Sequence, residues 1–73
     1  METEIKLKTP YITLGQLLKI VDIVSSGGQA KFFLQEYEGK ILVNGQADNR
    51  RGRKLYPQDR VEIAEFGSYI MKG

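Results

Sequence analysis

The sequence predicts an α+β fold in which two N-terminal helices pack on a small antiparallel sheet, with the elements in the order β-α-α-β-β-β. In two successive stretches before residue 40, apolar residues recur with the spacing of one helix face. After residue 40 the pattern becomes that of short strands, and Asn44-Gly45 gives a strong turn signal. Two helices next to several short strands can bury their apolar stripes by covering one face of the sheet.

The first strand and the first helix follow from a change of period near the N-terminus. Residues 4–8, EIKLK, alternate apolar and charged side chains, which is typical of a strand. Residues 13–21 then carry one helical stripe. The stripe consists of Leu14, Leu17, Leu18 and Val21. Thr13 and Gln16 have the spacing of a capping box, in which the cap contributes about 1 kcal/mol to the helix.

The second helix is expected within residues 26–40 and repeats the same arrangement. Ser26 and Gln29 again have capping spacing, and the connection at 22–25 is short. The apolar stripe consists of Ala30, Phe33, Leu34 and Tyr37. Gly39 is suited to end the helix, because glycine adopts the left-handed conformation of a helix C-terminus without strain.

Short strands are expected in the second half of the chain. Residues 41–43 are apolar and mostly β-branched, which favours a strand. Residues 54–56 and 60–66 are the next two candidates, and 57–59 form a turn between them. Residues 69–71 can add a last short strand.

Composition excludes several classes of function. The chain has 73 residues, so we expect one domain spanning 1–73. It has no cysteine and no histidine, which removes thiolate nucleophiles, imidazole bases and most transition-metal sites. No apolar run approaches the roughly 20 residues of a membrane span, and the N-terminus does not resemble a signal peptide. We expect a cytoplasmic protein without a cofactor and without membrane contact.

A search for catalytic groups gives no support for an enzyme. Without histidine or cysteine, a nucleophilic site needs a Ser-Lys arrangement. The only nearby candidates are Ser25, Ser26 and Lys31, and Ser26 is better explained as a helix cap. The Gly-Lys pair at 39–40 ends a helix, whereas the P-loop begins one.

One candidate anion site is the run NRRGRK at residues 49–54. Its cationic residues are Arg50, Arg51, Arg53 and Lys54, hereafter the basic run. The whole chain has 11 basic and 9 acidic residues, so this run concentrates positive charge in one place. The arginine fork matches phosphate geometry, and Gly52 allows close approach of the backbone. The alternative is an ordinary solvated turn.

A second candidate is the start of the second helix. Its residues are Ser26, Gly27, Gly28, Gln29 and Lys31. Exposed backbone N–H groups and the positive end of the helix dipole make such a start suitable for a phosphate. Lys31 adds a mobile charge one turn further along. A glycine-rich turn with a good cap remains the alternative.

Four stretches together resemble a known RNA-binding family. In order they are TLGQLLK, SSGGQAKFFL, GKILVNGQ and KLYPQDRVEI. They are similar to the S-four RNA-binding domain, also called the alpha-L motif, over about residues 13–63. The short standalone bacterial members of the YaaA and YbcJ type are most similar. In many members arginines stand where this chain has Thr13 and Gly27, which separates it from the ribosome-rescue and heat-shock members.

The resemblance implies binding of structured RNA, with ribosomal RNA or a pre-ribosomal particle as the expected partner. The arginines of the basic run are expected to contact phosphates, and the helix start at Ser26–Gln29 to bind another. Recognition is then expected to follow RNA shape more than base sequence. We expect a monomer.

Two other classes remain as alternatives. A β-grasp sulfur carrier has a similar size and a glycine C-terminus, but the Lys72-Gly73 end differs from the Gly-Gly tail that such carriers need. A protein-interaction adaptor could use the same arginines to bind an acidic partner. Competition by RNA distinguishes the adaptor from an RNA-binding protein.

Overall fold

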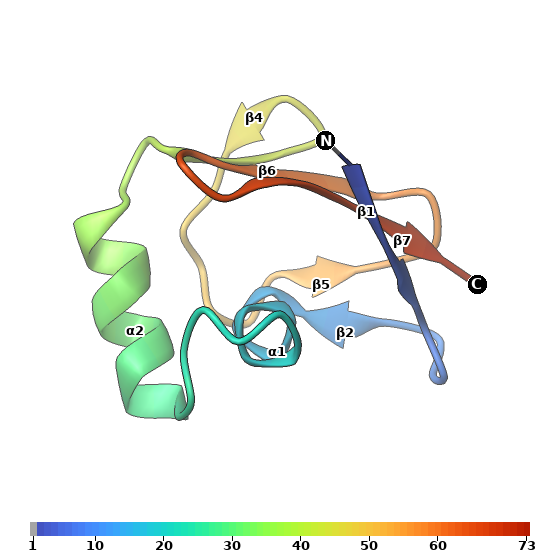
Figure 1. The fold of residues 1–73 in the computed structure, drawn as a ribbon, viewed down its shortest axis with the longest axis horizontal. Helices are drawn as coiled ribbons and strands as arrows, with labels where there is room; N and C mark the ends of the chain where they lie inside the picture. The colour runs from blue at the N-terminus through green and yellow to red at the C-terminus, as the bar shows by residue number, and fades with distance from the viewer. Residues whose placement is uncertain (1) are drawn as a thin grey trace.

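The computed structural model describes residues 2–73, and its largest element is a five-stranded sheet (Figure 1). The strands are ordered β1-β7-β6-β3-β4 across the sheet. Their bounds are Glu2–Lys6 for β1, Ile41–Val43 for β3, Gln46–Ala47 for β4, Arg60–Ile63 for β6 and Gly67–Lys72 for β7. The pairs from β7 to β4 are antiparallel, as predicted, and β1 adds a parallel pair with β7.

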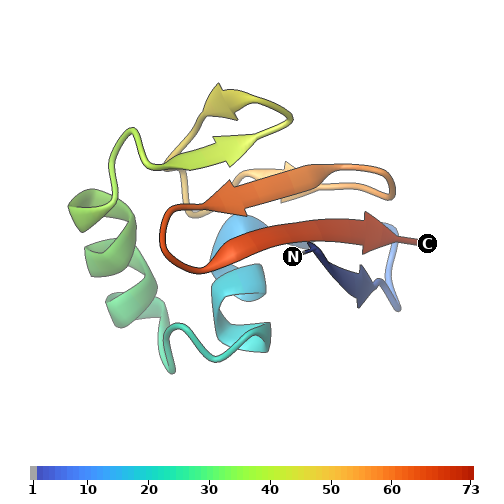
Figure 2. The same ribbon diagram turned by 45° about the horizontal axis from the view of Figure 1, so that its top comes forward.

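The helices and a short ribbon lie on one side of this sheet (Figures 1 and 2). The helices are α1, Leu14–Ile20, and α2, Gly27–Glu36. The ribbon is the antiparallel pair of β2, Ile12–Thr13, and β5, Lys54–Leu55. Neither helix of residues 2–73 is long and apolar enough to cross a membrane.

The predicted cap of α1 is confirmed, and that of α2 is modified. At α1 the Thr13 hydroxyl accepts the N–H of Gln16, whose side chain accepts the N–H of Thr13 in return. At α2 the Ser26 hydroxyl accepts the N–H of Gln29, but the Gln29 side chain accepts from Ser25 instead. The helix ends at Glu36, before the predicted limit of residue 40.

The turn predicted at Asn44-Gly45 is confirmed. Asn44 has φ 53° and Gly45 has φ 84°, which fits the turn that joins β3 to β4. The Asn44 side chain also accepts the N–H of Arg60 at 2.9 Å and donates to Asp59 at 3.0 Å. These two bonds attach the turn to the start of β6.

Several strand limits differ from the sequence prediction. The first strand occupies Glu2–Lys6 instead of 4–8, although Ile5 and Leu7 are both buried as expected. β6 ends at Ile63 instead of residue 66, because Glu65 enters the turn to β7 with φ 74°. β2 and β4 have only two residues each, which is too short to produce a detectable alternation.

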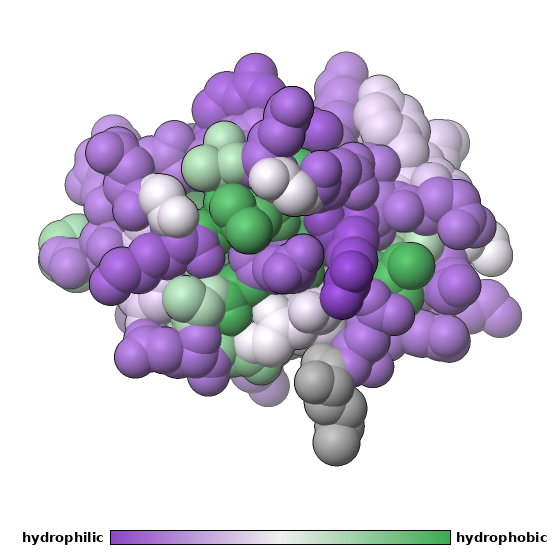
Figure 3. Space-filling view, turned by 90° about the horizontal axis from the view of Figure 1, so that it is seen from above, coloured by the Kyte–Doolittle hydropathy of each residue, from purple (hydrophilic) through white to green (hydrophobic). Residues whose placement is uncertain are grey.

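The core lies between the sheet and the helices. Its fully buried large side chains come from α1, β3, β5, β6 and β7, and they are Leu14, Leu17, Leu18, Ile41, Leu55, Met71, Val43 and Val61. Figure 3 shows the molecule from above the view of Figure 1, with a mostly hydrophilic surface in which hydrophobic residues are visible in separate small patches. The packing against α1 fixes the position of the helix start, where the candidate site begins.

Candidate nucleic-acid interface

The basic run is hydrogen-bonded to the start of α1. The N–H of Leu14 donates to the carbonyl of Arg53 at 2.8 Å, and that of Gly15 donates to the carbonyl of Arg51 at 3.0 Å. These bonds extend the β2–β5 ladder into the helix. The first N–H groups of a helix have no partner within it, so the basic run and the Thr13 cap satisfy those of α1. The start of α1 therefore has its donors engaged, and it holds the basic run in place.

Arg51 lies between the starts of the two helices. Its side chain packs on Gly15 so closely that a Cβ at this glycine would lie 2.6 Å from Arg51 Cγ. Its guanidinium reaches α2 and donates to the carbonyl of Gly27 at 3.2 Å. The structure thus brings together Arg51 and Gly27, which belong to the two separate anion-binding candidates of the sequence.

A small hollow separates the two helix starts, with a volume of about 310 Å³. Its lining residues are Thr13, Gly15, Gln16, Lys19, Gly27, Ala30, Arg51 and Gly52. Lys19 is a lining residue that was not predicted from the sequence. Lys19 lies four residues after Gly15 and is therefore on the same face of the helix. A helical projection of residues 13–21 would have shown that this lysine lies beside the glycine.

The start of α2 keeps free backbone donors. The Ser26 hydroxyl accepts the N–H of Gln29, and the N–H of Ala30 donates to the Ser26 carbonyl. Among residues 2–73, nothing accepts the N–H groups of Gly27 and Gly28, which point out of the positive end of the helix dipole. Such an end favours an anionic ligand.

The other selected residues of α2 take different positions. Lys31 is exposed and lies four residues after Gly27, hence on the same face of the helix. Gly28 and Gln29 line a separate groove with Phe32 on another side of α2. The side-chain Oε1 of Gln29 accepts from the N–H and the hydroxyl of Ser25, at 2.7 and 2.6 Å.

Asp48 binds two arginines of the basic run. Its carboxylate accepts from the guanidinium of Arg50 at 2.8 Å and from that of Arg53 at 2.9 Å. The hydrogen bonds from Arg50, together with its charge, hold the pKa of Asp48 well below its ordinary value. The carboxylate thus stays charged, offsets one positive charge of the run and fixes the loop. From the sequence, all four cations were expected to be free, so the two ion pairs to Asp48 were not predicted.

Arg51 and Lys54 are the members of the basic run without a carboxylate partner among residues 2–73. Lys54 lies with its Nζ 5.0 Å from the centre of the Tyr11 ring. Arg51 donates only to a backbone carbonyl, which leaves its charge uncompensated. These two cations, with Lys19 and Lys31, give the surface around the helix starts its positive charge.

Comparison with known proteins shows which family and which relative the chain is similar to. The family described as the S4 domain matches residues 5–71 of the chain, which extends beyond the range 13–63 of the sequence resemblance. A relative from Bacillus subtilis (strain 168), described as "Probable ribosome maturation protein RlbA", is 56% identical over 69 residues. The aligned part makes up 94% of this chain and 94% of the relative.

Proposed function

The chain belongs to the S4 domain family, and from this premise we propose that it is a non-catalytic protein that binds structured RNA during ribosome maturation. The proposed partner is ribosomal RNA or a pre-ribosomal particle, which would place the protein in the cytoplasm. The chain acts as one RNA-binding unit and needs no cofactor. The name of the Bacillus subtilis relative supports the step from RNA binding to ribosome maturation.

The observation that carries this proposal is the contact between Arg51 and Gly27. It joins a guanidinium without a carboxylate partner to a helix start with free N–H groups, so both can bind one stretch of sugar-phosphate backbone. Proteins commonly bind phosphate with arginine guanidinium groups and with the N–H groups at the start of a helix.

Each proposed contact has its own role in the RNA interface. Arg51 and Lys54 bind phosphates through charge, and the N–H groups of Gly27 and Gly28 bind a phosphate through hydrogen bonds. Lys31 adds charge along the same face of α2. Arg50 and Arg53 are paired with Asp48, so they fix the conformation of the loop and contribute less positive charge to the RNA-binding surface than Arg51 and Lys54 do. Ser26 and Gln29 act mainly through the conformation of the helix start.

A salt series of RNA binding tests the proposal. We expect the purified protein to bind a labelled ribosomal RNA hairpin, with log K falling against log salt at a slope of roughly −3 for about four phosphates. The double variant Arg51→Gln, Lys54→Gln removes two of these charges. Its slope is expected to become shallower by about 1.5.

A matched control separates a local effect from a general loss of charge. Lys40 lies over the Tyr37 ring at 5.8 Å, much as Lys54 lies over Tyr11, but at the far end of α2. The slope of Lys40→Gln should stay near that of the wild type, while Lys54→Gln alone should lose about 0.8. Equal slopes for these two single variants, or no binding of RNA at low salt, would contradict the proposal. A protein-interaction adaptor would then be the better explanation.

A further inference from the structure

Two tyrosines that are far apart in the sequence form an exposed pair beside the basic run. The rings of Tyr11 and Tyr56 have centroids 5.6 Å apart and are tilted by 48°. The pairing of β2 with β5 brings them together, because each tyrosine is next to one of these strands. The two residues are 38% and 47% exposed, whereas Tyr69 is 8% exposed in the core.

The pair is held in position without being buried. The backbone N–H of Tyr56 donates to the Asp59 carboxylate at 2.8 Å, which fixes the loop between β5 and β6. The Tyr11 carbonyl accepts from the Thr9 hydroxyl at 2.7 Å, and Lys54 lies over the Tyr11 ring. A fixed aromatic surface loses little conformational freedom when a flat ligand stacks on it.

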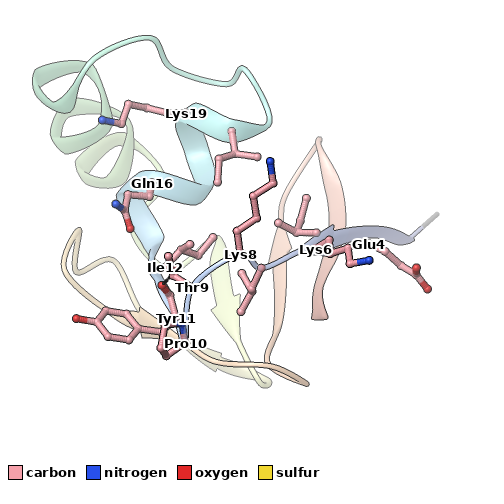
Figure 4. A pocket seen from close by; sticks show the side chains of 12 residues that line it. Glu4, Lys6, Lys8, Thr9, Pro10, Tyr11, Ile12, Gln16 and Lys19 are labelled. Carbon is pink, nitrogen blue, oxygen red and sulfur yellow. Dashed lines mark hydrogen bonds between the residues drawn. The ribbon is translucent and has the colours of Figure 1, made fainter. Parts of the chain in front are cut away.

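Basic hollows lie on both sides of the tyrosine pair. Tyr56 lines a hollow of about 540 Å³, together with Arg50, Gly52, Arg53, Lys54 and Asp59. Tyr11 lines a groove of about 1010 Å³ between β1 and α1, which also contains Lys6, Lys8 and Lys19 (Figure 4). One carboxylate lines each space, from Asp59 and from Glu4. Asp48 pairs with Arg50 and Arg53 of the first hollow, so among residues 2–73 the unpaired positive charge of that hollow is that of Lys54. The carboxylate of Asp59 is already hydrogen-bonded to Asn44 and to the N–H of Tyr56.

We propose that the Tyr11–Tyr56 pair is the stacking site for an unpaired nucleotide, whose flanking phosphates lie in the two basic hollows. Positive charge on both sides of an aromatic surface matches a nucleic-acid strand, in which phosphates flank every base. Side chains read RNA bases chiefly where these leave the helix and can stack on aromatic rings. The proposal rests on the proposed function and deepens it: the target is a helix interrupted by an unpaired base, and not a continuous duplex.

The test compares two RNA hairpins that differ by one bulged nucleotide. The bulged base is 2-aminopurine, whose fluorescence is quenched when it stacks on an aromatic ring. We expect the wild-type protein to bind the bulged hairpin roughly 5- to 100-fold more tightly than the paired one, as stacking of one base provides. We also expect binding to quench the 2-aminopurine fluorescence.

Three variants show whether the Tyr56 ring causes the preference for the bulged hairpin and the quenching of its fluorescence. Tyr56→Leu should lose the preference and the quenching, and it should still bind the paired hairpin as the wild type does. Tyr56→Phe keeps the ring and should retain both properties. Phe66→Leu is the matched control, because Phe66 is 46% exposed and lies in the turn between β6 and β7, near α2. Circular dichroism spectra confirm that each variant is folded.

The outcomes separate this site from the proposed function. A wild type that binds both hairpins equally, or Tyr56→Leu that keeps the quenching, would overturn the stacking site while RNA binding itself stands. The same holds if Phe66→Leu loses the preference as fully as Tyr56→Leu. Failure to bind either hairpin at low salt would overturn both proposals together.

Discussion

Replacing Gly15 with alanine tests whether Arg51 holds the two helix starts together. Gly15 is in the first turn of α1, with its backbone outside the left-handed region, so the helix itself favours alanine by about 1 kcal/mol. However, the new Cβ would lie 2.6 Å from Arg51 Cγ. The Arg51 Cγ cannot move far on its own, because it is close to the Arg51 backbone, whose carbonyl accepts the N–H of Gly15. The Arg51 side chain therefore has to adopt another rotamer and leave its position.

The displacement offsets the gain in helix propensity. Moving the guanidinium breaks its hydrogen bond to Gly27, and such a bond contributes about 1 kcal/mol. Packing of the arginine stem on α1 is also lost. We therefore expect Gly15→Ala to change the free energy of unfolding by between 0 and about −1 kcal/mol. In an Arg51→Ala background the clash is absent, and the same change should stabilise the protein by about 0.5–1 kcal/mol.

A double-mutant cycle measures the coupling between residues 15 and 51. It compares the urea unfolding of the wild type, Gly15→Ala, Arg51→Ala and the double variant, followed by far-ultraviolet circular dichroism. We expect a coupling free energy of about 0.5–2 kcal/mol between residues 15 and 51. RNA affinity should fall in Gly15→Ala even though the protein stays folded. If Gly15→Ala stabilises both backgrounds equally, Arg51 does not pack on α1, and the proposed geometry is wrong.

Two further predictions concern Asp48 and the β3–β4 turn. The pKa of Asp48 is lower in the folded state than in the unfolded state. The stability that its charge contributes is therefore present above the unfolded-state pKa of about 3.9 and is lost as the pH falls toward the folded-state pKa. Asp48→Asn should thus be less stable than the wild type at pH 7, and the difference should shrink in urea unfolding below about pH 4; a difference that is constant with pH would contradict this. Asn44→Ala should cost about 2 kcal/mol, because alanine strains at φ 53° and the bonds to Asp59 and Arg60 are lost. The exposed Gln46→Ala is the control, and an equal thermal shift of both variants would refute the role of Asn44.

The local features of the fold could be predicted from the sequence because neighbouring residues determine them. The Thr13–Gln16 capping box joins residues three positions apart. The Asn44-Gly45 turn needs two residues that tolerate positive φ. The periodicity of both helices also comes from spacing within one segment.

The arrangement of the site depends on contacts between distant segments, which local patterns do not contain. Arg51 and Gly27 are 24 positions apart, and the β2–β5 ribbon together with the packing of α1 against α2 brings them together. The parallel pair of β1 and β7 joins the two ends of the described chain. In contrast, the pairing of Asp48 with Arg50 was open to sequence reasoning, because the two residues are only two positions apart.

An amide NMR titration of the protein with a ribosomal RNA hairpin locates the RNA interface most directly. At 73 residues, each amide can be followed individually. We expect the largest shifts at Gly27 and Gly28, with further shifts across residues 50–54. Shifts confined to residues 64–68, around the turn between β6 and β7, or no shifts at low salt, would contradict an RNA interface at the two helix starts.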